Sequence, residues 1–293
     1  MAEVGLMIEA QEGLDWPRWR QIVRDAERLG FASLRTSDHC FSVMGQPTRS
    51  LSAWPALALA AEWSERLKLA PMVSPLTFYH PAILARTARA VDELSGGRVL
   101  LGVGTGWYQA EHEAFGIPFP SQKERFDNLE RGLERIQQTL SDHPLPILIG
   151  GGGPNRTIPL AARYASEWNF MEFNVEAYRA KSALLDDHCR QLGREPSEIR
   201  RSLMLGYLLG RNEAELRERA VAMGKVRGWP DKSPDEVLTE LRERRLVGTP
   251  QEAVAQLRPF VKAGVQEFCF QTLLLDDREA LELIAQEVMP ALQ

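Results

Sequence analysis

Residues 4–39 read VGLMIEAQEGLDWPRWRQIVRDAERLGFASLRTSDH, and this stretch contains the repeating unit that decides the fold. The short apolar run Val4–Ile8 predicts a strand. Asp15–Leu29 carries apolar residues at helical spacing on one face, so it predicts an amphipathic helix that a glycine ends. Phe31–Thr36 is again short and apolar and predicts a second strand. The order strand, helix, strand is typical of a parallel α/β unit.

The same alternation continues along the chain. Further strands are predicted at Leu67–Val73, Val99–Val103, Pro146–Ile149, Glu167–Met171, Arg201–Leu209 and Glu267–Leu273. Further helices are predicted at Ala53–Arg66, Pro81–Leu94, Glu124–Leu140, Arg156–Tyr164, Glu176–Leu192, Glu213–Met223, Pro234–Arg244, Thr249–Ala263 and Asp277–Leu292. Eight nearly continuous apolar strands with helices between them predict an α/β protein with a single (β/α)8 TIM barrel, and a doubly wound open sheet is the alternative. Because no linker-like segment divides the chain, we expect one barrel domain over residues 1–293.

The composition narrows the class of partner. A formal net charge of -5 argues against nucleic acid or an anionic membrane as the main partner. The 3 cysteines, Cys40, Cys189 and Cys269, are far apart, which indicates reduced thiols in a cytoplasm. The N-terminus lacks the pattern of a signal peptide, and no apolar run is long enough to span a bilayer. We therefore expect a cytoplasmic protein that binds a small molecule.

Two predicted strand ends carry polar side chains that suit catalysis. In a TIM barrel the chemistry lies at the C-terminal ends of the strands. The second strand ends in Ser37-Asp38-His39, where His39 can act as a general acid or base and Asp38 can orient a ligand. The alternative is an aspartate that caps a turn beside a surface histidine. The third strand runs into Ser74, which can donate a hydrogen bond to a ring carbonyl, whereas His80 precedes a helix-starting proline and is expected to be structural.

The fourth strand leads into the glycine-rich segment Gly102–Tyr108. Gly104 and Gly106 would let a flat ligand approach the backbone closely. The match to a G-x-G-x-x-G loop is loose, because no helix is expected directly after it. The next segment, Glu111–Gly116, mixes acids with a histidine, but a metal site needs inward ligands from several strands, so we expect no metal.

Aromatic residues near strand or loop ends are expected to pack in the core or to wall a flat heterocycle. They are Trp54, Phe78, Tyr79, Trp107 and Trp168.

The fifth strand ends in the best candidate anion site, Gly150-Gly151-Gly152-Gly153-Pro154-Asn155-Arg156-Thr157. The N–H groups of Gly151, Gly152 and Gly153 and the N-terminus of the helix predicted to open directly after them favour negative charge, and Arg156 can pair with phosphate. A tight strand-to-helix turn is the alternative, although it would rarely need four glycines. Phosphate sites of TIM barrels often follow strands seven and eight, whereas this one follows strand five.

The ordered set of these motifs resembles the luciferase-like family of flavin- and deazaflavin-dependent oxidoreductases, and the resemblance covers nearly the whole chain. The matching segments are Ser37-Asp38-His39, Leu94–Arg98, Leu101–Trp107, Glu111–Gly116, Phe119-Pro120, Glu124–Phe126, Gly150–Pro154, Ala161–Ala165, Trp168-Asn169, Val247–Pro250 and Ala263–Val265.

Within that family the chain is most similar to the branch that uses coenzyme F420. This resemblance implies hydride transfer between the deazaflavin and an organic substrate. It implies that Asp38 and His39 flank the cofactor, that Ser74 contacts it, and that the glycine run with Arg156 and Thr157 holds its phosphate. It also implies a peptide near Pro71-Met72 that is sometimes cis in relatives.

Two departures from the branch concern the substrate. The sugar-phosphate dehydrogenases of the branch have a glutamate after the strand-four glycines, where this chain has Trp107, and a tryptophan in the segment where it has Phe41, Ser42 and Val43. The connection Leu140–Pro146 before strand five is also short. We therefore carry over neither their substrate nor their acid–base assignment.

Three functions remain open from the sequence. The first is an F420-dependent oxidoreductase acting on an unknown organic substrate, with catalytic residues Asp38 and His39. The second is an FMN-dependent luciferase-like monooxygenase that needs a separate flavin reductase. The third is a barrel that binds a cofactor or small molecule without turnover. Barrels of this kind often pair through a helical face, so a homodimer is expected.

Overall fold

The computed structural model describes residues 1–44 and 49–293, and its strands are parallel to their neighbours. In chain order they are β1 (Glu3–Ile8), β2 (Ser33–Thr36), β3 (Lys68–Pro71), β4 (Ser74–Pro75), β5 (Leu101–Gly104), β6 (Ile147–Gly150), β7 (Glu167–Phe170), β8 (Arg200–Leu209), β9 (Leu246–Gly248) and β10 (Glu267–Thr272).

The strands close into a ring of eight positions. β3 and β4 share one position as an interrupted strand, because β3 pairs with β2 and β4 pairs with β5. A bridge between Leu69 and Val99 completes the closure. The order around the ring is β1, β2, β3 with β4, β5, β6, β7, β8 and β10, and β10 pairs with β1. The predicted (β/α)8 barrel is therefore confirmed, and the open sheet is wrong.

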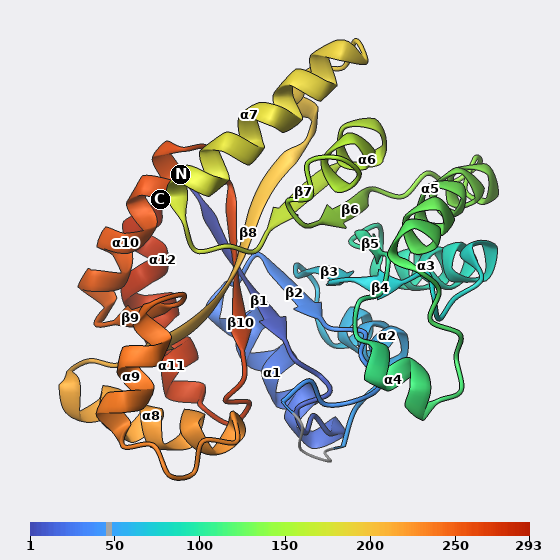
Figure 1. Ribbon diagram of the computed structural model, residues 1–293. Coiled ribbons are helices and arrows are strands. Elements are labelled where there is room, and N and C mark those ends of the chain that lie inside the picture. Colours follow the sequence, from blue (N-terminus) through green and yellow to red (C-terminus); the bar gives the residue numbers. More distant parts are fainter. Residues whose placement is uncertain (45–48) are drawn as a thin grey trace.

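Helices cover the outside of the ring (Figure 1). They are α1 (Trp16–Leu29), α2 (Ala53–Trp63), α3 (Pro81–Ser95), α4 (Gln109–Ala114), α5 (Gln122–Thr139), α6 (Thr157–Tyr164), α7 (Val175–Gln191), α8 (Glu213–Val226), α9 (Pro234–Arg242), α10 (Pro250–Lys262), α11 (Arg278–Leu283) and α12 (Met289–Leu292), with short turns η1 (Pro196–Glu198) and η2 (Ile284–Val288). Strands from both ends of the chain share the ring, which supports one domain over residues 1–293.

Three predicted details are corrected by the structure. The helix α4 begins directly after the Gly102–Tyr108 segment, where no helix was expected. The short strand β9, which pairs with β8, was not predicted. The last predicted helix is divided by the π-helical turn η2 between α11 and α12.

The helix ends are set by side chains that the sequence makes visible. In α1, the Asp15 side chain accepts a hydrogen bond from the backbone N–H of Arg18, and Gly30 ends the helix in the left-handed region with φ 82°. In α10, Thr249 and Glu252 form the predicted capping box, with Pro250 in the first turn. These caps fix where each helix leaves the barrel.

The ring interior holds a buried charge cluster near the N-terminal ends of the strands. Arg35 on β2 is 2% exposed and forms ion pairs with Glu167 on β7 (2.5 Å) and Glu267 on β10 (2.9 Å). Arg200 on β8 also pairs with Glu267, at 3.2 Å. A buried charge is tolerated only when it is paired and hydrogen-bonded. This cluster therefore fills one end of the barrel, and we expect the catalytic residues at the other end.

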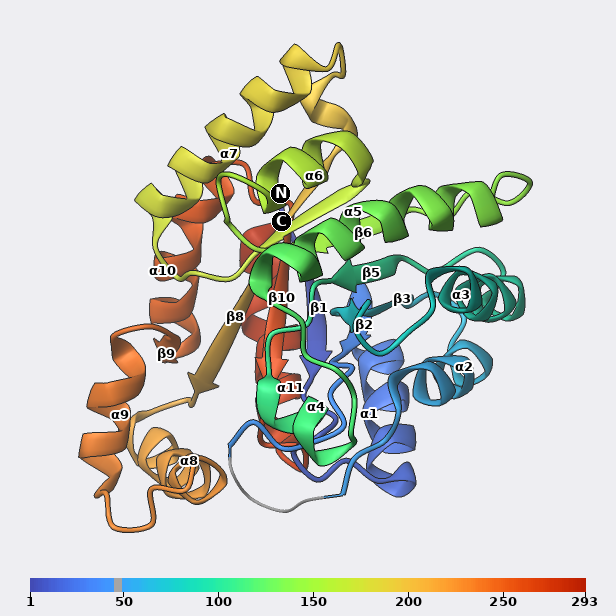
Figure 2. The same cartoon turned by 45° about the vertical axis from the view of Figure 1, so that its right-hand side comes forward.

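The C-terminal ends of the strands form that other end, which we call the mouth. The arrows of β1, β8 and β10 point toward it, and α4 and α8 lie beside it (Figures 1 and 2). Within the residues that the structure describes, no helix is both long and apolar enough to cross a membrane.

Candidate functional site

Asp38 lies at the mouth, directly after β2, and two hydroxyl groups hold its carboxylate. The Ser74 hydroxyl of β4 donates to Oδ2 at 2.5 Å, and the Tyr79 hydroxyl donates to Oδ1 at 3.2 Å. The indole Nε1 of Trp54, on α2, donates to the Ser74 hydroxyl at 3.1 Å. The structure thus brings the predicted residues Asp38 and Ser74 together and adds Trp54 and Tyr79 to them.

The environment of Asp38 raises the pKa of its carboxyl. Burial is the main cause, and the hydrogen bonds from Ser74 and Tyr79 oppose it only in part. The Ser74 proton is already used by Asp38, so a ring carbonyl would not be its first acceptor. A rigid carboxyl with a raised pKa suits the recognition of a polar ring edge by hydrogen bonding.

His39 points to a second buried carboxylate, that of Glu111 on α4. The ring Nδ1 of His39 lies 2.9 Å from Oε1 of Glu111, and the backbone N–H of Cys40 donates to Oε2 at 3.1 Å. Since Glu111 is 1% exposed, its charge faces His39 with little screening. Nδ1–H therefore donates to Glu111, and Nε2 is left to exchange a proton with a ligand.

The pKa of His39 lies above its ordinary value. Burial alone would lower it, but the hydrogen bond and the charge of Glu111 more than offset burial. The neighbouring Cys40 is exposed, but partial burial of its thiol, followed by the charges of Asp38 and Glu111, raises the pKa of the thiol to about 11, which disfavours the thiolate.

Glu111 is the residue that the sequence did not assign. The glutamate expected from the F420 branch is absent at Trp107, whose exposed ring instead packs edge-on against His39 with centroids 5.5 Å apart. A carboxylate reaches the histidine from four residues further on, because α4 turns Glu111 inward. The acidic segment was visible in the sequence, but six helical residues are too few to show a period.

Gly104 and Gly106 have a packing role in the structure. A Cβ at Gly104 would lie 2.7 Å from Cγ2 of Val73, and one at Gly106 would lie 2.4 Å from Oγ1 of Thr77. Both glycines let the end of β5 lie against the chain around β4. Their predicted contact with a flat ligand stays a prediction. The cis peptide bond lies between Met72 and Val73, one bond beyond the expected place.

The glycine run after β6 leaves two backbone N–H groups without an acceptor among the described residues. Gly151 has φ 111°, and the backbone N–H groups of Gly152 and Gly153 donate no hydrogen bond to any described residue. Thr157 is buried at the first turn of α6. Two free N–H groups before a helix N-terminus favour a phosphate.

The guanidinium of Arg156 already pairs with carboxylates, so it is less available to a phosphate than the sequence suggested. Its Nη2 lies 2.7 Å from Oδ1 of Asp127 on α5 and 3.7 Å from Oε2 of Glu130. Lys123 and, after it, Arg156 lower the pKa of Asp127 to about 2. A phosphate at the glycine run would therefore share this guanidinium with Asp127.

The other aromatic and histidine residues considered from the sequence pack against neighbouring side chains or lie exposed. Trp168 is buried, and its Nε1 donates to the Gly151 carbonyl at 2.8 Å. It therefore packs in the core and does not line a ligand site. Phe78 packs against His112, with ring centroids 4.6 Å apart. His80 is exposed at the start of α3. Among the residues described, no group of three or more His, Cys, Asp or Glu side chains is placed to hold a metal ion.

Comparisons with known proteins cover most of the chain. The family model described as luciferase-like monooxygenase matches residues 1–267. An F420-dependent glucose-6-phosphate dehydrogenase of Intrasporangium calvum is 27% identical, over 92% of each chain.

Solved structures show the same fold at low identity. An F420-dependent secondary alcohol dehydrogenase, solved with an F420-acetone adduct, superposes with a TM-score of 0.84 at 18% identity, over 100% of this chain and 99% of the other. The oxygenating constituent of 3,6-diketocamphane monooxygenase from Pseudomonas putida, solved with FMN, gives 0.77 at 18% identity, over 99% of each chain.

Proposed function

Because the chain belongs to the luciferase-like monooxygenase family, we propose that it is an oxidoreductase that uses coenzyme F420 to transfer a hydride to or from an organic substrate. The relative from Intrasporangium calvum supports F420 as the cofactor. The single observation that carries the proposal is the His39–Glu111 pair beside the buried Asp38, at the end of the barrel where TIM-barrel chemistry occurs.

The residues at the mouth fit such a cofactor. The free N–H groups of Gly152 and Gly153 suit a phosphate, and Asp38 with Ser74 suits the polar edge of a flat ring. We propose that these residues hold the cofactor together with others of the strand ends. The others are Gly104, Gly106, Gly151, Arg156 and Thr157.

Coenzyme F420 supplies the hydride chemistry when it is bound. In the proposed mechanism, Asp38 orients the ring and His39 moves a proton at Nε2 to or from the substrate oxygen. Glu111 fixes the tautomer and the orientation of His39 and stabilises its protonated form. The edge of Trp107 restricts the approach of water to the imidazole.

An FMN-dependent monooxygenase with a separate reductase is the second candidate. The free N–H groups of Gly152 and Gly153 would suit the phosphate of FMN equally well, and a structural neighbour was solved with FMN. A barrel that binds a cofactor without turnover is the third.

Parallel fluorescence titrations with F420 and FMN separate these candidates. We expect tight binding of F420 and weak binding of FMN. Tight binding of FMN alone would overturn the first proposal. Binding of F420 without reduction or oxidation of any alcohol or carbonyl compound would favour the non-catalytic barrel.

We also propose that the protein is a cytoplasmic homodimer. Ile83 and Leu94 are exposed on α3, three helical turns apart on one face, which supports a paired helical surface. The free thiols of Cys40, Cys189 and Cys269 agree with a reducing compartment. Light scattering after size-exclusion chromatography should give twice the chain mass, and Ile83→Glu with Leu94→Glu should give the monomer.

A further inference from the structure

Three aromatic side chains from two loops lie beside His39 at the mouth. Trp107 packs edge-on against the His39 imidazole, with ring centroids 5.5 Å apart, and the Tyr108 ring lies 6.3 Å from the same imidazole. The rings of Trp107 and Tyr108 are 5.3 Å apart, and those of Phe41 and Tyr108 are 6.4 Å apart. We call Phe41, Trp107 and Tyr108 the aromatic patch. Its rings form one connected apolar surface next to the residue proposed to exchange a proton.

The ring of Phe41 is exposed although the backbone around it is held in place. Its side chain belongs to a residue that is 40% exposed. On one side of it, the backbone N–H of Cys40 donates to Glu111 at 3.1 Å. On the other side, the backbone N–H of Val43 donates to Glu12 at 3.0 Å. Because both neighbours are anchored, the exposure of this ring follows from the fold of the loop.

Trp107 is also exposed on an anchored backbone. It is 63% exposed. The carbonyl of the next residue, Tyr108, accepts a hydrogen bond from Nδ1 of His112 at 2.8 Å, and the Tyr108 hydroxyl donates to the Ser42 carbonyl at 3.3 Å. Exposed apolar side chains that gather at one place on a surface commonly mark a contact site for a ligand or a partner.

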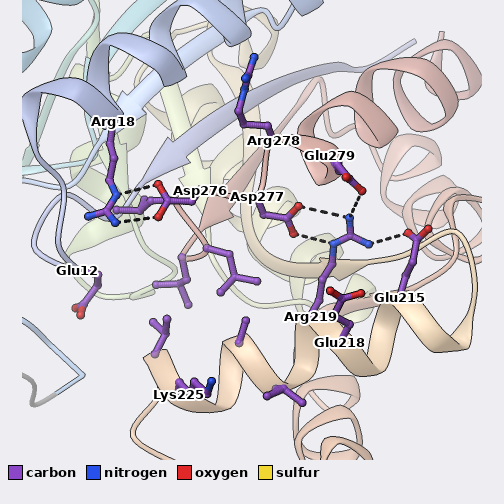
Figure 3. Close-up of a pocket in the computed structure, with 16 residues that line it drawn as sticks. Glu12, Arg18, Glu215, Glu218, Arg219, Lys225, Asp276, Asp277, Arg278 and Glu279 are labelled. Carbon is purple, nitrogen blue, oxygen red and sulfur yellow. Dashed lines mark hydrogen bonds and ion pairs between the residues drawn. The ribbon is translucent and has the colours of Figure 1, made fainter.

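A hollow of about 880 Å³ opens near this patch, between α8 and the segment after β10, and its lining is acidic. Of its ten charged residues, which Figure 3 labels, six are Asp or Glu and four are Arg or Lys. The cations are three arginines and Lys225 of α8. An anionic group that entered the hollow would therefore meet more negative than positive charge.

The arginines of the hollow are already paired with carboxylates. Figure 3 shows Arg18 held by Asp276, at 2.9 Å, and Arg219 held by Asp277, at 2.7 Å. Arg278 pairs with a carboxylate of α1, also at 2.7 Å. A guanidinium that a carboxylate holds in this way has little left to offer an anionic ligand. Among the described residues that line the hollow, a single lysine is left to bind an anion.

The hollow and the aromatic patch border the same loop segment. Glu12, which lines the hollow, accepts hydrogen bonds from the Ser42 hydroxyl at 2.8 Å and from the Val43 N–H at 3.0 Å. Ser42 in turn holds Tyr108 of the patch through its carbonyl. A carboxylate of the hollow thus lies directly beside the segment that carries Phe41.

We propose that the organic substrate is an uncharged alcohol or carbonyl compound whose flat aromatic body lies on the aromatic patch. Such a body would cover the exposed rings of Phe41 and Trp107 and remove their apolar surface from water. A phosphate or carboxylate on the substrate would find no unpaired arginine in the hollow and would face its excess of carboxylates. Assignment of the patch to the substrate rests on the proposed function, whereas binding of an uncharged aromatic compound there does not.

NMR titrations followed at the indole N–H of Trp107 test the patch directly. The uncharged probe is naphthylmethanol, and naphthoate is the anionic probe with the same ring. Naphthylmethanol should shift this signal, and naphthoate should bind there at least about 10-fold more weakly because of the neighbouring carboxylates. Equal affinities of the two probes at this signal, or no shift by naphthylmethanol, would overturn the proposal.

Substitutions separate the aromatic patch from other exposed aromatic residues. Phe41→Ala and Trp107→Ala should each weaken calorimetric binding of naphthylmethanol about 3- to 10-fold, the size of one lost aromatic contact. Trp107→Phe keeps a ring and should restore most of the affinity. Trp16→Ala is the matched control, because Trp16 is 42% exposed at the start of α1 and lies outside the patch. An equal loss of affinity in Trp16→Ala would contradict a specific role for the patch.

Melting temperature and mass separate binding of a substrate from other roles of the same rings. Because Phe41 and Trp107 are exposed, their alanine variants should melt within about 2 °C of the parent protein. A larger fall together with unchanged naphthylmethanol binding would make the rings structural. Loss of a dimer in the double alanine variant, measured by light scattering, would assign the patch to a second copy of the chain and overturn the proposal.

Repeating the naphthylmethanol titration with saturating F420 identifies the ligand that the patch serves. Naphthylmethanol should bind the F420 complex at least as tightly as the free protein. Its exclusion by F420 would give the patch to the cofactor and overturn the assignment to the substrate. Failure of F420 to bind would leave the naphthylmethanol result standing and count only against the proposed function.

Discussion

At the scale of single residues, the site depends on the proton that His39 carries. Glu111 accepts a hydrogen bond from Nδ1–H, which leaves Nε2 as the nitrogen that can exchange a proton. We predict that His39→Ala lowers turnover by about 10²–10⁴-fold, the usual contribution of a general acid or base. Steady-state kinetics under saturating cofactor would measure it. The exposed His80→Ala is the control, and an unchanged rate in His39→Ala would remove the proposed role.

Glu111 acts through His39, so its substitution should change a pH profile as well as a rate. The charge of Glu111 raises the pKa of His39. Glu111→Gln removes that charge, so the His39 limb of the kcat/KM profile should move to lower pH. NMR titration of the imidazole would give the same direction independently. Glu113→Gln, exposed on the outer side of α4, should leave the limb in place.

At the scale of elements, the long and strongly patterned ones could be predicted, and the short ones could not. Most barrel strands lie within short, largely apolar runs bounded by polar or glycine residues, so all eight were found within a few residues of their observed bounds. The elements α4 and β9 have six and three residues and show no period of their own. Tertiary contacts decide such elements, as with the buried Glu111 of α4.

The same difference, between a local sequence pattern and a tertiary contact, separates the site residues that could be predicted from those that could not. Asp38 and Ser74 lie at strand ends, where the barrel rule points, and the structure brings them together. Glu111 lies on a connecting helix whose position depends on the folded chain.

The end of β5 provides a prediction at the scale of an element. Gly104→Ala places a methyl group 2.7 Å from Cγ2 of Val73, so we expect a loss of about 1–3 kcal/mol in the free energy of unfolding. Urea denaturation would measure it. Gly150→Ala is the matched control at the end of β6, because its nearest neighbour would be at an ordinary 3.9 Å. Equal losses in the two variants would show that the close approach does not matter.

At the scale of the whole molecule, the cluster around Arg35 joins opposite sides of the ring. Arg35→Met would leave Glu167 and Glu267 as buried carboxylates that lack this partner. We predict a loss of about 3–5 kcal/mol in the free energy of unfolding, because breaking a buried ion pair costs more than replacing both partners. Chemical denaturation would measure it. Adding Glu167→Gln to Arg35→Met should recover part of the loss; a further loss would contradict this explanation.

The small strand β9 has a consequence for how the protein behaves at high concentration. A closed ring offers no strand edge to another molecule, whereas β9 is paired with β8 on one side. Its other side would invite pairing between molecules if it were long. It is only three residues long and is followed after Thr249 by Pro250, which cannot donate a backbone hydrogen bond. The chain thus adds a strand outside the ring without making a template for aggregation.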